Sequence, residues 1–427
     1  MKNVSQPKVL VVGAGAREHA ILAALARSPQ RPELLCAPGN AGIAQLARLC
    51  PVAVDDVDRL VRLAREEAVD LVVVGPEMPL VAGLADALRD ADIPCFGPTR
   101  AGAALEGSKA FCKEVMEAVE VPTAAYRVVE SVEDGLAAIT EVQGDRWPAV
   151  IKADGLAAGK GVIIAASPDE ARAALTALLV DRRFDTERVV VEEFMAGEEC
   201  SLLAICDGVT ALPLVSAQDY KRIFDGDQGP NTGGMGCYSP MPAIDADAAS
   251  AIVARIHQPV LDELRRRGIE FRGVLYAGLM LTDRGVKVIE FNARFGDPET
   301  EVILPRLKSD LLEILHLAAT DSLSGVQLDW DERPAVTVVA ASAGYPASSS
   351  SGDLITGVDS PRADTLVFHA GTALDADGRL VTAGGRVLCV TALGDSFSAA
   401  RDSAYAAMDE VQFPGRQLRR DIAQKVV

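Results

Sequence analysis

The segment 288–301 constrains the fold more than any other part of this chain. Its first residues alternate as they do along a β-strand, with Ile289, Phe291 and Ala293 on one face and Glu290, Asn292 and Arg294 on the other. Burying such a charged face without a ligand would be costly. Carboxylate and amide oxygens are ligands that Mg²⁺ prefers, and a guanidinium binds phosphate. The segment therefore predicts a strand that binds a metal ion and a phosphate; a solvated face with a local salt bridge is the alternative.

Residues 1 to about 105 alternate apolar strands with helical segments. We expect strands at 9–12, 34–37, 70–74 and 94–96, with helices at 17–27, 57–67 and 81–89 between them. Continuous apolar strands separated by helices are typical of a doubly wound parallel sheet. Ligands bind at the carboxyl ends of such strands, where Pro38, Gly75 and Gly97 lie.

The rest of the chain predicts a small α+β unit, longer strands and a final mixed region. A helix at 108–118, with Ser108 as its N-cap, precedes strands at 149–153 and 162–165, a helix at 168–179 and a strand at 189–193. Strands at 201–206, 274–281 and 287–292 and helices at 251–267 and 310–319 follow. Strands at 335–343, 365–368 and 386–391 and a helix at 396–408 end the pattern.

Composition excludes several classes of partner. The 42 basic and 61 acidic residues give a net charge of −19, which argues against nucleic acid or an anionic membrane as the main partner. None of the eight cysteines forms a C-x-x-C pair, which favours buried thiols in a reducing compartment over disulfides or zinc ligands. The start is too short and polar for a signal peptide, and no apolar run approaches the roughly 18 residues of a membrane span. We therefore expect a cytoplasmic protein.

A glycine-containing turn near the start of the chain is the first candidate phosphate site. Gly13-Ala-Gly15-Ala-Arg-Glu18 lies between a strand and a helix, where backbone N–H groups bind phosphate. Glu18 stands at the third glycine position of the dinucleotide fingerprint and disfavours a pyrophosphate, whereas Arg17 favours a single phosphate. A dinucleotide site and a purely structural turn are the alternatives. His19 is expected to pack the helix, not to catalyse.

Lys109, Lys152 and the hairpin 154–161 form a second candidate. Lys152 ends an apolar strand and needs an anionic partner, and the hairpin glycines let the backbone approach phosphates closely. The spacing from Gly155 to Lys160 differs from that of a Walker A loop, and a strand follows in place of a helix. An ordinary surface hairpin is the alternative.

Two further segments suit a nucleotide and a sugar phosphate. The extended segment 192–195 suits an adenine edge, and Glu199 suits ribose hydroxyls, although a solvated acidic turn fits equally. Asp219-Tyr-Lys-Arg222 leads to Gly229-Pro-Asn-Thr-Gly-Gly-Met-Gly236, in which the glycines leave backbone N–H groups beside two basic residues. This second segment predicts a phosphate or sugar-phosphate site, with a structural loop as the alternative.

Taken in order, these segments resemble the phosphoribosylamine–glycine ligase (glycinamide ribonucleotide synthetase) family of the ATP-grasp superfamily, essentially from end to end. The motifs that carry the resemblance are APGNAG at 37–42, LEGSKAF at 105–111, IKADGLAAGKGV at 151–162, GPNTGGMG at 229–236, EFNARFGDPE at 290–299, HAGT at 369–372 and GGRVLCVTALG at 384–394. GPNTGGMG and RFGDPET are highly specific when they occur together. Ala16, Ala293, the serine run 348–351 and the end Leu418-Arg-Arg-Asp-Ile-Ala423 depart from the usual pattern.

The resemblance implies an α/β multidomain fold. A Rossmann-like, doubly wound parallel sheet would occupy 1–106, an ATP-grasp domain 107–330 with a small α+β lid at about 122–194, and a mixed α+β domain 331–427. It implies ATP-dependent ligation of glycine to 5-phospho-D-ribosylamine through glycyl phosphate, the second step of de novo purine biosynthesis. The implied cofactors are ATP and Mg²⁺ or Mn²⁺, and the implied partners are small molecules, with no nucleic acid or membrane, for a monomer or a dimer. Since little follows the third domain, a single activity is expected.

The resemblance also implies roles for individual residues. Mg²⁺ would be held by Glu290 and Asn292, and catalysis would involve Lys152, Arg294 and Asp297. ATP would be bound by Lys109, Lys152, Gly155, Gly159, Lys160, Gly161, Glu192, Glu193, Phe194, Met195 and Glu199. Phosphoribosylamine and glycine would be bound by Gly15, Arg17, Glu18, Gly39, Asn40, Glu77, Asp219, Lys221, Pro230, Asn231, Thr232, Gly233, Gly234 and Asp297, the last near the glycine ammonium.

Three other functions fit parts of the sequence less well. An NAD-dependent oxidoreductase is opposed by Glu18 in the glycine turn. A biotin-dependent carboxylase component shares the ATP-grasp core, but the chain has no Met-Lys-Met biotin site. A non-catalytic nucleotide-binding relative is opposed by the presence of Glu290, Asn292 and Arg294.

Overall fold

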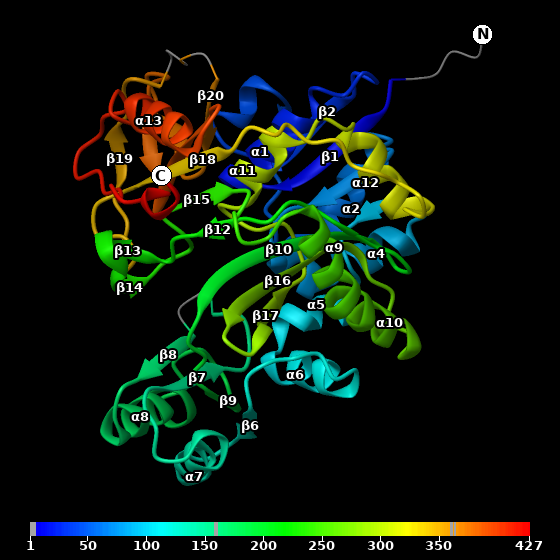
Figure 1. Ribbon diagram of the computed structural model, residues 1–427. Coiled ribbons are helices and arrows are strands. Elements are labelled where there is room, and N and C mark those ends of the chain that lie inside the picture. The colour runs from blue at the N-terminus through cyan, green and yellow to red at the C-terminus, as the bar shows by residue number, and fades with distance from the viewer. Residues whose placement is uncertain (1–5, 158–160, 359–361, 363) are drawn as a thin grey trace.

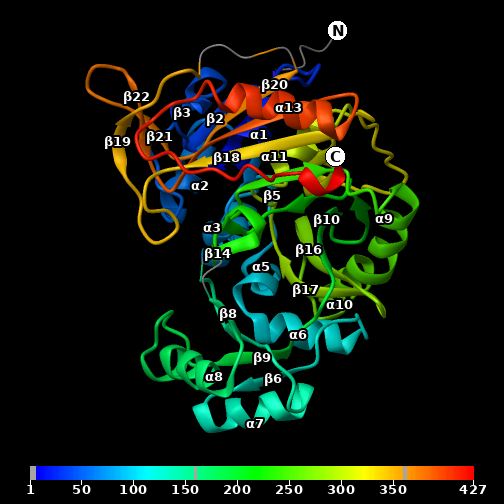
Figure 2. The ribbon, with the colours of Figure 1, turned by 60° about the vertical axis from the view of Figure 1, so that its left-hand side comes forward.

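The computed structural model describes residues 6–157, 161–358, 362 and 364–427 (Figure 1). The chain forms an N-terminal parallel sheet, a central antiparallel sheet, a lid subdomain (about 122–194) and a C-terminal antiparallel sheet. The lid extends downward in Figures 1 and 2, away from the N-terminal and C-terminal sheets at the top. Within the described residues, no helix is both long and apolar enough to cross a membrane.

The N-terminal sheet has the order β3-β2-β1-β4-β5 with all neighbours parallel, which confirms the predicted parallel sheet. Its strands are β1 (Lys8–Gly13), β2 (Glu33–Pro38), β3 (Arg48–Leu49), β4 (Leu71–Val74) and β5 (Cys95–Phe96); its helices are α1 (Ala16–Leu25), the short η1 (Ile43–Gln45), α2 (Val57–Glu66), α3 (Glu77–Ala82), α4 (Leu84–Asp90) and α5 (Arg100–Gly107). Alternate residues of β1 pack into two separate cores, Leu10 and Val12 on one face and Val9 and Val11 on the other. The strand is continuously apolar because both faces are buried.

The helix predicted at 81–89 is divided into α3 and α4. Gly83 lies between them with φ of +94°, a left-handed conformation that a residue with a side chain rarely adopts. A side chain there would also meet the guanidinium of Arg100. The prediction of one helix was therefore wrong, because apolar periodicity does not reveal a helix that ends and restarts at a glycine.

The lid is a four-stranded antiparallel sheet with helices on one face. Its order is β6-β9-β7-β8, with β6 (Tyr126–Val129), β7 (Ala149–Ala153), β8 (Val162–Ala165) and β9 (Val189–Glu193). The helices α7 (Val132–Gln143) and α8 (Pro168–Leu175), the latter extended by the π-helical turn η2 (Thr176–Val180), pack on the sheet around Ile151, Val191 and Leu175. β7, β8, β9 and α8 were predicted from the sequence, whereas β6 and α7 were not.

The central sheet carries the segment with which the sequence analysis began. Its order is β11-β10-β16-β17, with β10 (Glu198–Asp207), β11 (Ala211–Pro213), β16 (Arg272–Thr282) and β17 (Gly285–Asn292). The helices around it are α6 (Lys109–Ala118), α9 (Ala246–Ile252), η4 (Val253–His257), α10 (Gln258–Arg266), α11 (Thr300–Ile303), η5 (Leu304–Arg306) and α12 (Leu311–Thr320). The core of this sheet is continuous with one face of the N-terminal sheet, so the two sheets share one hydrophobic core.

A β-bulge in β17 alters the predicted alternation. Gly278 pairs with Glu290 and Leu279 with Val288, so Ile289 has no partner of its own. Val288 and Phe291 are buried, whereas Ile289 is only partly buried. The prediction that Ile289 shares the buried face was therefore wrong, but Glu290 and Asn292, beyond the bulge, still alternate with buried Phe291.

The C-terminal sheet has the antiparallel order β12-β15-β18-β23-β20. Its strands are β12 (Gln218–Asp219), β15 (Gly236–Ser239), β18 (Ala335–Ala341), β20 (Thr365–His369) and β23 (Arg386–Leu393), with helix α13 (Phe397–Met408) packed on it. A second sheet joins β19 (Ser351–Leu354), β21 (Thr372–Leu374) and β22 (Leu380–Ala383), and a separate hairpin joins β13 (Arg222–Phe224), the turn η3 (Asp225–Asp227) and β14 (Gln228–Asn231). The chain ends in η6 (Gln424–Val426). Since β12 and β15 belong to this sheet, the glycine-rich segment 229–236 is anchored beside the C-terminal region of the chain.

Candidate active site

The predicted metal ligands lie at the end of β17, close to lysines from two other elements. Glu290 Oε2 lies 3.6 Å from Lys109 Nζ, at the first turn of α6. Burial alone would raise the pKa of Glu290, but nearby cations, first Lys109 and then Lys152, lower it to about 2. Glu290 is therefore an ionised oxygen donor, and Asn292, two residues further along the strand, adds an amide oxygen. Such hard oxygen donors among cations suit a Mg²⁺ ion that is shared with phosphate groups.

Lys152 is held by a buried carboxylate that also binds a second lysine. Lys152 Nζ lies 2.9 Å from Glu192 Oε2 and donates to Ile289 O at 3.0 Å, which links the lid to β17. Lys113 Nζ, from α6, lies 3.2 Å from the other oxygen of Glu192. All three charged side chains are only 3% exposed. Glu192, predicted to bind ATP, thus uses its side chain to place two lysines.

The inner face of the lid sheet is mostly apolar apart from Lys152 and Glu192. Neighbouring strands place Tyr126, Glu192, Val150 and Ile164 in one row across the sheet. The helices α7 and α8 cover the opposite face, so this row faces the central sheet. A flat apolar surface beside lysines is suited to a nucleotide base.

The end of β9 continues the same surface. Phe194 is 42% exposed, and its backbone N–H donates to Gln143 Oε1 at 3.1 Å. Glu193 binds Lys287 of β17 at 2.9 Å and accepts from the N–H of Ala125, so its side chain links the lid to the central sheet. The exposed phenyl ring is therefore the part of segment 192–195 most available to a ligand.

The hairpin 154–161 is joined to α6 at its first residue. Asp154 Oδ1 accepts from Ser108 Oγ at 2.9 Å and from the N–H of Ala110 at 3.1 Å, and Arg188 binds its other oxygen. Ser108 accepts from the N–H of Phe111, which confirms the predicted N-cap. Gly155 and Gly161 are part of the described hairpin, whereas Gly159 and Lys160 lie outside the described residues. The lid hairpin and the lysine helix α6 are thus positioned by one carboxylate.

Arg294 lies between two carboxylates from the N-terminal region. Its guanidinium is 2.8 Å from Glu106 Oε1 and 3.3 Å from Glu77 Oε2. Burial raises the pKa of Glu106, while Arg294 and the N–H of Ala293 act against that rise. Glu106 and Lys113 are buried site residues that the sequence analysis missed. Lys113 follows Lys109 by one helical turn, and that spacing was the available signal.

The side chain of Glu18 fills the glycine turn after β1. Its two oxygens accept from the N–H of Gly15 at 2.5 Å and from Arg17 Nε at 2.6 Å. Side chains at Gly13 or Gly75 would overlap it. A carboxylate therefore occupies the amino end of α1, which argues against a pyrophosphate there.

Asn40, predicted to bind substrate, uses its side-chain amide to hold its own loop. Its Nδ2 donates to Ala14 O and His369 O at 2.9 and 2.8 Å, and its Oδ1 accepts from the backbone of the turn that follows. The N–H of His369 donates to His19 Nδ1 at 2.9 Å. His19 therefore packs α1 against the C-terminal region, as the sequence analysis expected, and burial followed by the charge of His369 lowers its pKa to about 3.

Lys221 connects Glu199, predicted to bind ribose, with Asp219, predicted to bind the acceptor substrate. Its Nζ lies 3.0 Å from Glu199 Oε2 and 2.7 Å from Asp219 Oδ1. Burial raises the pKa of Asp219 to about 6, although the charge of Lys221 opposes the rise. Beside this pair, Glu299 Oε1 accepts from Ser201 Oγ at 2.8 Å and from Tyr276 Oη at 3.0 Å. This hydroxyl network fixes the chain directly after Asp297.

Asp297 is held by an arginine from the C-terminal sheet. Arg386 Nη2 lies 3.1 Å from Asp297 Oδ2, and Arg386 Nη1 donates to Asp297 O at 3.0 Å and to Gly233 O at 2.5 Å. Arg386 was not predicted as a site residue, since nothing in the chain order indicates this contact. Glu301, fully buried nearby, has a pKa raised well above its usual value, chiefly by burial and then by Asp297.

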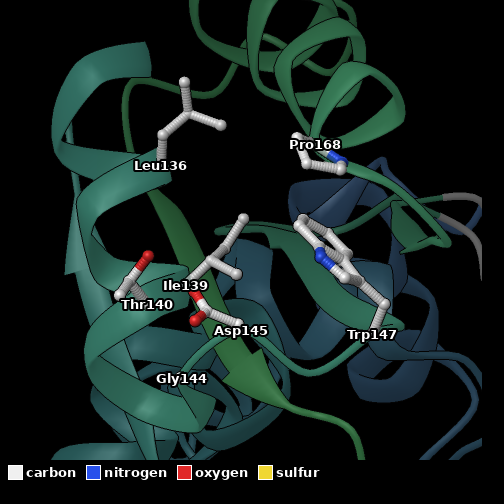
Figure 3. A pocket seen from close by; sticks show the side chains of 7 residues that line it. All are labelled: Leu136, Ile139, Thr140, Gly144, Asp145, Trp147 and Pro168. Carbon is white, nitrogen blue, oxygen red and sulfur yellow. The ribbon is translucent and has the colours of Figure 1, made fainter.

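A pocket in the lid is lined by residues outside the predicted site. Its volume is about 270 Å³, and it lies between α7 and the start of α8 (Figure 3). The lining residues are Leu136, Ile139, Thr140, Gly144, Asp145, Trp147 and Pro168. None of these residues belongs to the predicted site. In the described part of the chain, no three His, Cys, Asp or Glu side chains converge as a metal cluster.

Comparison with known proteins adds an independent line of observation. The chain matches family models described as the phosphoribosylglycinamide synthetase N domain over residues 7–106, the ATP-grasp (A) domain over 107–300 and the C domain over 335–425. A phosphoribosylamine–glycine ligase of Streptomyces coelicolor is 51% identical over 423 residues, which cover 98% of this chain and 99% of that protein.

Two solved structures resemble the whole chain. The crystal structure of phosphoribosylamine–glycine ligase from Thermotoga maritima matches with a TM-score of 0.83 and 34% identity, covering 97% of this chain and 100% of that one. A biotin carboxylase domain from Hydrogenobacter thermophilus, in complex with MgADP, ADP and bicarbonate, matches with a TM-score of 0.73 and 17% identity over 96% of this chain and 91% of that one. The second likeness is one of fold alone.

Proposed function

This chain belongs to the phosphoribosylglycinamide synthetase family, and on that premise we propose how its residues carry out the family's reaction. The protein is an ATP-dependent ligase that joins glycine to 5-phosphoribosylamine, giving glycinamide ribonucleotide, ADP and phosphate in purine biosynthesis. The geometric observation that supports the assignment most strongly is ionised Glu290, placed beside Lys109 at the end of β17.

The reaction needs two steps and no nucleophile from the protein. A carboxylate oxygen of glycine attacks the γ-phosphorus of ATP, the bond to the bridging oxygen breaks, and ADP leaves. The amine nitrogen of phosphoribosylamine then attacks the acyl carbon of glycyl phosphate, the amide bond forms, and phosphate leaves with the former carboxylate oxygen while the amine loses a proton. The chain's own contribution is positioning, neutralisation of charge and exclusion of water from the acyl phosphate.

The nucleotide half of the site lies between the lid and β17. We assign the phosphates to Lys109, Lys152 and the hairpin 154–161, including Gly159 and Lys160 outside the described residues, and the base to the inner lid face and segment 193–195. Glu199 is assigned to the ribose hydroxyls. Glu290 and Asn292 would hold Mg²⁺ or Mn²⁺, which supplies positive charge beside the transferred phosphoryl group.

The acceptor half lies between the N-terminal turns and segment 219–236. We assign phosphoribosylamine to the turns at Gly15–Glu18 and Gly39–Asn40, to Glu77, and to segment 219–234. Since the side chains of Glu18 and Asn40 hold their own turns, the backbone of these turns is the part offered to the ligand. Asp297 is assigned to the glycine ammonium, and Arg386 holds the carboxylate of Asp297 in place.

The remaining assignments concern the molecule as a whole. We propose domains at 1–106, 107–330 and 331–427, with the lid at about 122–194. A cytoplasmic location is supported by the eight cysteines, all of which are free thiols, seven of them buried. A monomer or a dimer is expected, and light scattering of the purified protein distinguishes the two.

The activity is tested by measuring ADP release with Mg-ATP, glycine and freshly made phosphoribosylamine in all combinations. We expect ADP only with both substrates present, together with an equal amount of glycinamide ribonucleotide. Release that does not depend on phosphoribosylamine would point to another acceptor amine. Release that needs bicarbonate in place of glycine would favour the carboxylase alternative, whose fold the chain shares.

A further inference from the structure

We propose that the C-terminal tail (Arg419–Ala423) positions the β13–β14 hairpin for binding the acceptor substrate, and that Arg419 is the positioning residue. The inference rests on the proposed function, because it takes segment 219–234 as the phosphoribosylamine site. It adds a residue from the end of the chain, about 190 positions from the hairpin in sequence, to the determinants of that half-site. Figure 1 shows the red C-terminal segment passing beside the green hairpin.

The hairpin cannot hold its own position. It is a two-stranded sheet of seven strand residues with an irregular register between Arg222 and Phe224, and Phe224 is 56% exposed. Isolated two-stranded hairpins are marginally stable at best in water. Only Ile223 is buried among the hydrophobic residues that these two strands contribute. Some other element must therefore fix the hairpin, and the contacts identify the tail.

Arg419 is fully buried and joins the tail to the hairpin through its guanidinium. Its Nε and Nη2 donate to the two oxygens of Asp421 at 2.7 and 2.6 Å. Its Nη1 donates to Asp227 Oδ1 at 2.7 Å and to Arg222 O at 3.2 Å, and these two acceptors lie on opposite sides of the hairpin turn. A planar guanidinium with a two-point carboxylate contact allows little freedom of orientation. Arg419 thus fixes the hairpin relative to the tail.

Backbone hydrogen bonds reinforce the contact in both directions. The N–H of Arg420 donates to Asp225 Oδ1 at 2.7 Å, and the N–H of Gly226 donates to Asp421 Oδ2 at 2.8 Å. The tail is itself held by Tyr405, whose hydroxyl donates to Arg419 O at 2.8 Å. The hairpin therefore makes four hydrogen bonds with the tail, and the tail is anchored on helix α13 through Tyr405.

The ends of the hairpin are hydrogen-bonded to residues of the acceptor site, so the position of the hairpin determines theirs. Thr232 donates through its N–H and its hydroxyl to Lys221 O, at 2.7 and 2.9 Å. Arg222 pairs with Asn231, so the two ends of the hairpin are the basic residue Lys221 and the glycine-rich loop 232–236. A displacement of the hairpin would move both ends, and with them the groups assigned to the sugar phosphate. Among the groups assigned to ATP, Lys109, Lys152 and Glu290 lie on other elements, and Glu199 meets Lys221 only in a partly exposed ion pair, a kind of contact that contributes little.

The experiment compares Arg419→Met with Arg420→Met. Arg420 is a matched control, because its side chain is 52% exposed and pairs with Asp409 on the surface, while its backbone contact survives the substitution. We expect Arg419→Met to raise the KM for phosphoribosylamine about tenfold, equivalent to about 1.4 kcal/mol. The KM values for ATP and glycine should change by no more than about twofold, as should all constants of Arg420→Met. Ribose 5-phosphate, used as a stable competitor, should show the same loss of affinity.

A second variant guards against a folding defect. Asp227→Asn removes the charge on the hairpin side, and asparagine tolerates the left-handed backbone of this residue, φ +53°. It should raise the KM for phosphoribosylamine about threefold, again without affecting ATP. An Arg419→Met enzyme with unchanged KM for phosphoribosylamine, or with equal losses for all three substrates, would overturn the inference. If the unmodified enzyme used no phosphoribosylamine at all, the proposed function would fail instead.

Discussion

Replacing Lys152 by methionine separates the stability of the lid from its role in catalysis. Lys152 and Lys113 bind the two oxygens of Glu192 at 2.9 and 3.2 Å, and all three side chains are almost completely buried. Removing one partner of a buried ion pair costs about 3–5 kcal/mol. Since Glu192 keeps one lysine in either single variant, we expect the lower end, about 3 kcal/mol, in both Lys152→Met and Lys113→Met.

The two variants should differ in activity. Lys152 lies on the inner lid face and reaches β17, whereas Lys113 donates to Thr123 Oγ1 at 2.7 Å and is not among the residues assigned to the phosphates. Loss of a charged group that stabilises the transferred phosphoryl group costs about 10²–10³ in kcat. We therefore expect that loss for Lys152→Met and less than about tenfold for Lys113→Met.

Urea unfolding and steady-state ADP release measure the two effects on the same preparations. Methionine preserves the apolar stem of lysine, so the comparison isolates the ammonium group. Equal kcat losses in the two variants would mean that the activity follows the stability of the lid alone. Full activity of Lys152→Met would remove Lys152 from the phosphate site. Either result would refute the reasoning.

Three further predictions concern other parts of the site. The pKa of His19 is about 3 in the folded protein, against an ordinary value of 6.5. The contribution of His19 to stability is therefore complete above pH 6.5 and is lost as the pH falls toward 3. Between pH 7 and pH 5, the free energy of unfolding of the unmodified protein should fall by about 2 kcal/mol more than that of His19→Asn. Gly75→Ala should cost about 1–3 kcal/mol, because its new methyl group would overlap Glu18, while Gly107→Ala, which has room, should be tolerated in a thermal melt. Glu290→Gln should raise the Mg²⁺ concentration for half-maximal activity about tenfold or more, whereas an unchanged metal titration would exclude Glu290 as a ligand.

The regular parts of the fold were accessible from the sequence because local pattern and burial agree there. β1 and β4 are short apolar runs that end at glycine, and such runs have few alternatives to a strand buried on both faces. β6 was missed because only one of its four residues is buried, as suits an edge strand of the lid sheet. The bulge at Ile289 was also inaccessible, since register depends on the partner strand β16.

The candidate site also contains some residues that the sequence could indicate and others that it could not. Residues within recognisable motifs, such as Glu290 and Lys152, were named from the sequence and lie together around the end of β17. Glu106, Lys113 and Arg386 were not named, because their importance comes from contacts with residues distant in the chain. The structure also refines roles within the motifs, since the side chain of Glu192 binds two lysines.

The central claim is that glycine is activated by phosphoryl transfer in this site, and isotope transfer tests it most directly. The enzyme would be given ATP, phosphoribosylamine and glycine labelled with oxygen-18 in both carboxylate oxygens, and the phosphate released would be analysed by mass spectrometry. The account predicts one labelled oxygen in each phosphate and the other in the amide of the product. Unlabelled phosphate formed together with product would contradict it, because the carboxylate of glycine would then never have been joined to the γ-phosphorus.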